Sequence, residues 1–190
     1  MKLLGFVGAT FVAAAQLLPP TNVEQLQKLA DSCAQAVCQY LPGGKYVAFE
    51  VEPHPAQWLL EHAFAAGLAR CGVVILEAAD TVTRLKVVIT DIGVIYERLS
   101  EGHVRRTVRL GVVPTLRLSN RQLVALPTWR AVHADTLSIA VVAAVEQPAY
   151  PFATARVPEH RSFWRDLLEP ALALAAGGVI LVLLFSLRTR

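Results

Sequence analysis

Charged side chains are scarce in this chain of 190 residues: Asp, Glu, Lys and Arg make up 17% of it, whereas an ordinary soluble domain carries roughly a quarter. Three of the basic residues, Lys2, Arg188 and Arg190, lie at the two ends. Without them the basic and acidic residues are equal in number, at fifteen each. A neutral central region offers no electrostatic attraction for a phosphate backbone, so we expect no nucleic-acid partner.

The sequence also lacks the common catalytic signatures. It contains no G-x-S-x-G, H-E-x-x-H, P-loop or dinucleotide-binding fingerprint, which excludes the enzyme classes that depend on them. We therefore expect a protein that is not an enzyme, without a cofactor and without a small-molecule substrate.

One cluster of metal-ligating residue types is present. Glu50, Glu52 and His54 alternate, so a strand would point all three side chains to one face, as a small metal site or enzyme would require. The other interpretation is a solvated strand face, and Pro53 disturbs a strand beside His54. We favour the second interpretation and predict no metal ligands.

The three cysteines leave their redox state open. Cys33 and Cys38 are five residues apart on a predicted helix, about 8 Å between Cα atoms, which is too far for an easy disulfide. Cys71 ends the next predicted helix and could pair with one of them. Buried free thiols are the alternative.

Long apolar runs are abundant, and they lie at the chain ends. Residues 3–15 are mostly apolar and follow Lys2, with small residues at Ala13 and Ala15, which predicts a signal peptide over residues 1–15. A retained N-terminal anchor is the alternative, although the run is short for a membrane span. Either interpretation carries the following domain across a membrane.

Residues 170–187 contain no charge and would form about 27 Å of helix, close to the hydrocarbon thickness of a bilayer. They predict a transmembrane helix over 167–187. Arg188 and Arg190 favour a cytoplasmic tail over 188–190, and Trp164 would lie at the outer interface. Ala173 and Gly177 have the spacing of a helix–helix contact. The predicted location is the inner membrane, with a single span and a periplasmic domain.

Between these ends, the patterns predict an α+β domain over 21–147, in which helices pack on a mostly antiparallel sheet in two layers. A capping box begins the first helix at Thr21 and Glu24, and Gly72 is placed to end the second. Residues 135–146 fit a helix capped by Asp135 or a buried strand, and we favour the helix. The other predicted helices extend over 21–41 and 55–71. The predicted strands extend over 46–51, 72–76 (a short buried strand), 83–99 with a bulge at Gly93, 104–118, 121–126 and 129–133, with a turn over 77–80 and a Pro-rich linker and juxtamembrane segment over 148–166.

Basic side chains mark one face of the strand predicted over 104–118. Arg105, Arg109 and Arg117 alternate with apolar residues, so they lie opposite the predicted core. They form a possible partner surface, and the competing interpretation is a charged face that keeps the sheet soluble. Trp58 and Trp129 are interpreted as core or rim packing.

The order of elements resembles an envelope lipoprotein superfamily that includes the curli-secretion protein and the penicillin-binding-protein activators. The resemblance rests on HPAQWLLEHAFAAGLARCG, VVILEAADTV, RLKVVITDIGVIY and RRTVRLGVVPTLRL, and on the turn at Ala79 and Asp80. It covers roughly residues 40–130, and the chain departs from those families in lacking a lipidated Cys and in its predicted span. The resemblance implies a non-enzymatic role in envelope assembly or in regulating a protein partner. The alternative is a small structural subunit of a larger membrane complex.

Overall fold

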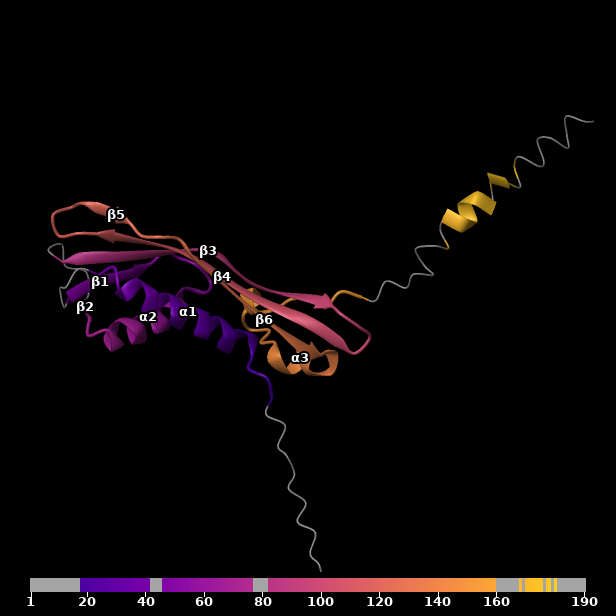
Figure 1. The fold of residues 1–190 in the computed structure, drawn as a ribbon, viewed down its shortest axis with the longest axis horizontal. Coiled ribbons are helices and arrows are strands. Elements are labelled where there is room, and N and C mark those ends of the chain that lie inside the picture. Colours follow the sequence, from indigo (N-terminus) through magenta and orange to yellow (C-terminus); the bar gives the residue numbers. More distant parts are fainter. Residues whose placement is uncertain are drawn as a thin grey trace, which may run out of the picture.

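A computed structural model describes residues 18–41, 46–76 and 82–159, together with helical residues at 168, 170–175, 177, 178 and 180. It confirms the α+β class (Figure 1). The elements are, in chain order, α1 (Asn22–Cys38), β1 (Tyr46–Val51), α2 (Gln57–Arg70), β2 (Val74–Leu76), β3 (Thr83–Arg98), β4 (His103–Arg117), β5 (Leu123–Ala125), β6 (Trp129–Ser138), α3 (Ile139–Val145) and the 3-10 helix η1 (Pro151–Ala153).

The sheet is mostly antiparallel, as predicted, but it is mixed, because β1 has parallel neighbours. Its order is β2-β1-β3-β4, and β4 then pairs with β5 at one end and with β6 at the other. β1 runs parallel to both β2 and β3, because α2 carries the chain back across the sheet between β1 and β2, as parallel neighbours require. The long hairpin of β3 and β4 is antiparallel.

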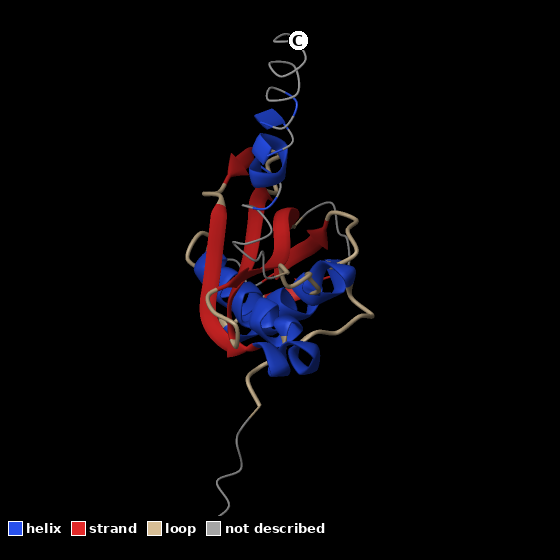
Figure 2. Ribbon diagram, turned by 90° about the vertical axis from the view of Figure 1, so that its right-hand side faces the viewer, coloured by secondary structure: helices blue, strands red, loops and turns tan. Residues whose placement is uncertain are grey.

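Helices α1 and α2 pack on one face of this sheet (Figures 1 and 2). Along β4 the alternate residues that face these helices are buried: Val104, Arg106, Val108, Leu110, Val112, Pro114 and Leu116. Within the part of the chain that the structure describes, no helix covers the opposite face. The period-two pattern therefore separates a buried face from an exposed face.

Both predicted helix signals in the first half are confirmed. The Thr21 side chain accepts a hydrogen bond from the Glu24 N–H, and the Glu24 carboxylate accepts one from the Thr21 N–H. At the end of α2, Gly72 has φ +73°. The Gly72 N–H donates to Ala69 O and the Val73 N–H to Leu68 O, each at 3.0 Å. This Schellman arrangement satisfies the last carbonyls of the helix.

The bulge in β3 lies at Thr90, so the prediction of a bulge at Gly93 was wrong. The register shifts between Ile89 and Asp91, whereas Gly93 pairs regularly with Arg109. Gly111 on β4 explains the position: a Cβ there would lie 3.1 Å from Thr90 Oγ1 and 3.2 Å from Asp91 Cβ. The missing side chain on the neighbouring strand makes room for the extra residue.

The predicted helix over 135–146 was wrong for residues 135–138, which belong to a strand. β6 continues to Ser138, well past the strand predicted over 129–133, and the helix α3 begins only at Ile139. Asp135 lies within β6 opposite Arg106 of β4. Pairing with a strand remote in the sequence outweighs the local capping signal.

Two further segments differ from expectation. β2 is a sheet edge rather than a buried strand, and its Val74 is 48% exposed. Residues after Pro148 do not leave the domain as a free linker: Ala153 is fully buried, and Tyr150, Phe152, Ala155 and Val157 pack against the core. Packing therefore continues past the predicted domain end at 147, because these apolar side chains cover the inner face near β3.

The predictions at the chain ends lie largely outside the described residues. Outside the described residues lie the predicted signal peptide over 1–15 and the residues Trp164, Arg188 and Arg190. The predicted turn over 77–80, in the middle of the chain, also lies outside them. Of 167–187, the described residues are helical, and they include Ala173 and Gly177. No helix among the described residues is long and apolar enough to cross a membrane. The transmembrane helix stays a prediction.

Candidate functional site

A small cavity lies where β4 changes its neighbour. β4 pairs with β6 up to Val112 and with β5 from Thr115. Between them, Pro114 has no N–H to offer a strand, and its carbonyl accepts the Leu126 N–H at 3.3 Å. The connection from β5 to β6 therefore leaves the sheet and opens a cavity of about 100 Å³. It is lined by Ala36, Val37, Gln39, Tyr40, Pro114, Leu126, Pro127, Thr128 and Trp129.

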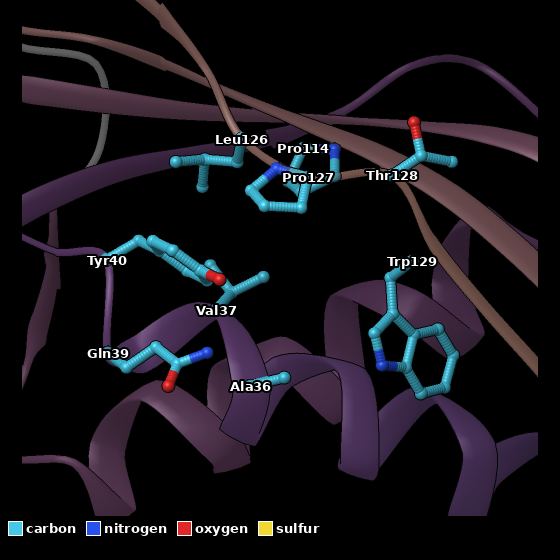
Figure 3. A pocket seen from close by; sticks show the side chains of 9 residues that line it. All are labelled: Ala36, Val37, Gln39, Tyr40, Pro114, Leu126, Pro127, Thr128 and Trp129. Atoms are coloured by element: carbon cyan, nitrogen blue, oxygen red, sulfur yellow. The ribbon is translucent and has the colours of Figure 1, made fainter.

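The lining of this cavity, which we call the β5–β6 pocket, is mostly apolar. Figure 3 shows Tyr40 and Trp129 on opposite sides, with the two prolines above the end of α1. Tyr40 is 44% exposed, so the pocket has an accessible aromatic wall. Small-molecule sites usually measure about 300–1,000 Å³. A volume near 100 Å³ instead suits one apolar side chain of a binding partner.

Sequence reasoning missed this pocket. Trp129 was interpreted as core or rim packing, and Tyr40 was not identified as a site residue. Trp129 is half-buried and packs against the core while one side lines the pocket. The available signal was Pro114 within a predicted central strand, because proline there indicates an interruption of the sheet ladder.

The arginine stripe lies on the exposed face of β4, and two of its members have acidic partners. Arg105 lies 3.8 Å from Glu97, and Arg109 lies 3.4 Å from Asp91. Both pairs are exposed, so each contributes at most about 1 kcal/mol. Arg117 is exposed and lies opposite Arg84 of β3. A role for Arg105, Arg109 and Arg117 in partner binding stays a prediction.

The acidic cluster at the end of β1 is divided among local partners. Glu52 forms an ion pair with Lys86 of β3, which raises the pKa of that lysine, and Glu50 is exposed. His54 Nδ1 accepts the Ala56 N–H at 3.0 Å, just before α2 begins. No group of three or more His, Cys, Asp or Glu residues suited to a metal ion occurs among the described residues.

The cysteines form one disulfide and one buried thiol. Cys38 at the end of α1 is bonded to Cys71 at the end of α2. Cys33 is fully buried, and burial raises the pKa of its thiol to about 12. A thiol is a nucleophile only when it is deprotonated, so Cys33 is not poised for redox or covalent chemistry at neutral pH.

A buried polar cluster lies at the other end of α1. Arg106 is fully buried and donates from Nε to Asp135 Oδ1 at 2.8 Å and from Nη2 to Asp135 Oδ2 at 2.5 Å. Its Nη1 donates to Pro20 O at 2.8 Å and to Asn22 Oδ1 at 3.1 Å. Asn22 Nδ2 in turn donates to the Tyr96 hydroxyl at 3.0 Å and to Ala153 O at 2.8 Å. We call this set the Arg106 cluster.

The Arg106 cluster joins five segments of the chain and keeps its charges paired. Burial acts to raise the pKa of Asp135, but the hydrogen bonds and positive charge of Arg106 together hold that pKa below its usual value. Burial raises the pKa of Tyr96. Neither pKa shift indicates a reactive group, because the side chains of Asp135 and Tyr96 are hydrogen-bonded within the cluster. The cluster is therefore structural, and no pattern in the sequence singled out Arg106.

The aromatic residue Trp58 lies outside the pocket. Its side chain is 40% exposed, and its ring centroid lies 5.1 Å from that of Tyr150. This contact fixes the segment before η1 against α2. Trp58 is thus a rim residue, as the sequence suggested.

Comparisons with known proteins return little. No family model matches the chain, and no curated protein matches it. Among solved structures, rare lipoprotein B from Shewanella oneidensis is similar at 13% sequence identity and a TM-score of 0.31, over 76% of this chain and 96% of that one. At that TM-score we base no argument on the likeness.

Proposed function

We propose that this chain is a non-catalytic accessory protein of the cell envelope that binds another protein through the β5–β6 pocket. The observation that carries the proposal is the pocket itself: an apolar cavity of about 100 Å³ between Tyr40 and Trp129. Interfaces obtain most of their affinity from a few apolar or aromatic anchors held in such pockets. One side chain of a partner fills a volume of this size.

The disulfide supports export of the domain. Cys38 and Cys71 lie at the ends of two helices that pack together, and such bonds persist in oxidising compartments such as the periplasm. This agrees with the predicted signal peptide or N-terminal anchor. The proposed location is the outer side of the inner membrane, held by a single span over 167–187.

The Arg106 cluster supports a fixed arrangement of residue 20 and residue 153 on the domain. Arg106 holds Pro20 and, through Asn22, the backbone of Ala153. A domain held in this way would present a constant face to its partner.

The residues that the sequence offered for chemistry have other roles or positions in the structure. Cys33 is a buried thiol, and the carboxylates Glu50 and Glu52 are an exposed group and a member of an ion pair. The proposal therefore rests on the pocket.

The test is site-specific photo-crosslinking in intact cells. A photoreactive phenylalanine analogue replaces Tyr40 in one variant and Trp58 in another, because these aromatic side chains are similarly exposed, at 44% and 40%. We expect a discrete crosslinked partner from position 40 and none from position 58. The partner should then co-purify with the unmodified chain and be lost with Leu126→Arg, which places a charge in the pocket.

Three results would contradict the proposal. They are equal crosslinking from both positions, a partner retained by Leu126→Arg, and a purified chain with no partner at all. A reporter fused after Arg190 tests the topology separately: activity on the periplasmic side would overturn the predicted orientation. Circular dichroism of Leu126→Arg confirms that the variant folds.

A further inference from the structure

The strand β6 lies at an open edge of the sheet. It runs for ten residues and pairs with β4 in one uninterrupted register, without a bulge. No residue of the described part of the chain pairs with its other side. Natural edge strands usually carry proline, charged side chains or a bulge that prevents pairing with another strand. β6 has no proline, lysine or bulge, and its charged residues are Arg130 and Asp135, of which Asp135 is paired with Arg106.

The hydrogen bonds show which backbone groups of β6 are open. The Ile139 N–H donates to Gly102 O at 3.0 Å, one pair beyond the end of the register between β4 and β6. In an antiparallel ladder every second residue directs its N–H and C=O to the same neighbour. Odd-numbered residues of β6 therefore face β4, and even-numbered residues present both groups to the open edge. These are Arg130, Val132, Ala134, Thr136 and Ser138, and all five side chains are exposed.

We consider antiparallel pairing of β6 with β6 of a second copy. When Ala134 lies on the two-fold axis, compatible side chains lie opposite each other on both faces of the sheet. Val132 then lies opposite Thr136, which suits two β-branched side chains. On the other face, His133 lies opposite Asp135, whose carboxylate is bonded to Arg106 of its own chain, so no like charges face each other there. Moving the axis by one residue to His133 would place two imidazoles against each other.

We propose that two copies of this chain pair through their β6 strands, antiparallel and with Ala134 at the axis, to form one continuous sheet. The even-numbered residues then exchange backbone hydrogen bonds across the axis. The exposed Val132, at 62% exposure, becomes covered by the partner copy. The proposal depends neither on the β5–β6 pocket nor on the predicted span.

The register is tested by cysteine crosslinking of the full chain in detergent. Residues in a hydrogen-bonded antiparallel pair have Cα atoms about 5.5 Å apart, within the range of a disulfide. We expect Ala134→Cys to form disulfide-linked dimers under mild oxidation. The native cysteines do not interfere, because Cys33 is buried and the other two are bonded to each other.

Val132→Cys is the matched control on the same face of the same strand. In this register the two copies of residue 132 lie about 13 Å apart or more, since they are offset by four residues. We expect it to crosslink at least several-fold more slowly than Ala134→Cys. A mixture of Val132→Cys and Thr136→Cys chains should crosslink readily.

A backbone variant tests the hydrogen bonds. Ala134→Pro removes an N–H that faces the open edge and leaves the ladder with β4 intact, whereas Ala134→Ser retains the N–H. Light scattering should show a dimer for the natural chain and Ala134→Ser, and a monomer for Ala134→Pro. The proposal is overturned by a monomeric natural chain, by equal crosslinking at positions 132 and 134, by a dimeric Ala134→Pro, or by a different protein crosslinked at position 134 in place of a second copy.

Discussion

The two ends of the sheet are held together in different ways. At the end that contains β1, β2 and α2, the interior is apolar, with the rings of Phe49 and Phe64 stacked 5.1 Å apart, and a disulfide joins α1 to α2. At the end that contains β6 and α3, the interior surrounds the Arg106 cluster. The helix α1 and the hairpin of β3 and β4 pass through both ends (Figure 1).

The difference follows from what the strands supply. Between Trp129 and Leu137, the inward residues of β6 are Ala131, His133 and Asp135, which bury little apolar surface. A fully paired arginine fills this space and defines one arrangement of the segments around it, since a buried charge tolerates few alternatives. One end therefore gains stability from apolar burial and a crosslink, and the other gains a unique geometry from hydrogen bonds.

The largest effect should come from Asp135→Ala. It leaves the fully buried Arg106 without its carboxylate, and breaking a buried pair in this way costs about 3–5 kcal/mol. Urea unfolding measures the loss, and hydrogen exchange should show it first in β6 and α3. The double variant Arg106→Met with Asp135→Leu should recover most of the stability. A loss below about 1 kcal/mol, the range of exposed pairs, would show that the charges are not buried.

Removal of the disulfide should have a slightly smaller effect at the opposite end. The bond joins residues 33 apart in the sequence, and the chain-entropy model assigns about 3–4 kcal/mol to a loop of that length. The variant Cys38→Ala with Cys71→Ala should unfold at lower urea. Faster hydrogen exchange confined to α1 and α2 is expected, while early loss of protection in β6 would contradict the division between the two ends.

Gly67→Ala should disturb the contact between α1 and α2. A Cβ at Gly67 would lie 2.6 Å from the Cβ of Ala34, and overpacking of this kind costs about 1–3 kcal/mol. Thermal unfolding measures the change. Adding Ala34→Gly to the same chain should relieve the clash, and a failure to do so would place the strain elsewhere.

The smallest effect is a pH dependence. Because the pKa of Asp135 is lowered in the folded state, its contribution to stability is complete above its unfolded pKa, near 4, and is lost as the pH falls through the lower folded value. The difference in unfolding free energy between the natural chain and Asp135→Ala should therefore be constant at neutral pH and shrink in acid. A stability difference between the two chains that grows below pH 4 would contradict a lowered pKa of Asp135.

Local signals in the sequence predicted the first half of the domain well. The helix predicted over 55–71 is α2, and its apolar residues Leu59, Leu60, Ala63, Phe64 and Leu68 are buried. The capping box at Thr21 and the left-handed Gly72 were also found. These features depend on residues within one or two turns of one another, so the sequence displays them directly.

The candidate site and the second half depended on remote contacts. Asp135 fits a helix cap by its neighbours, and only Arg106, 29 residues away, makes it part of a strand. The β5–β6 pocket combines the end of α1 with residues near 114 and 126–129, which no local pattern connects. The cysteine pairing was left open for the same reason, because it depends on how two helices pack.

By itself, the sequence determined the class of the domain, the positions of α1 and α2, the long hairpin and the neutrality of the central region, since periodicity, capping and charge are properties of short segments. Only the tertiary structure decided that Cys38 pairs with Cys71, that Arg106 is buried against Asp135, and that β6 has an open edge. Each of these depends on the distance between residues far apart in the chain, and that distance exists only after the sheet and helices have packed.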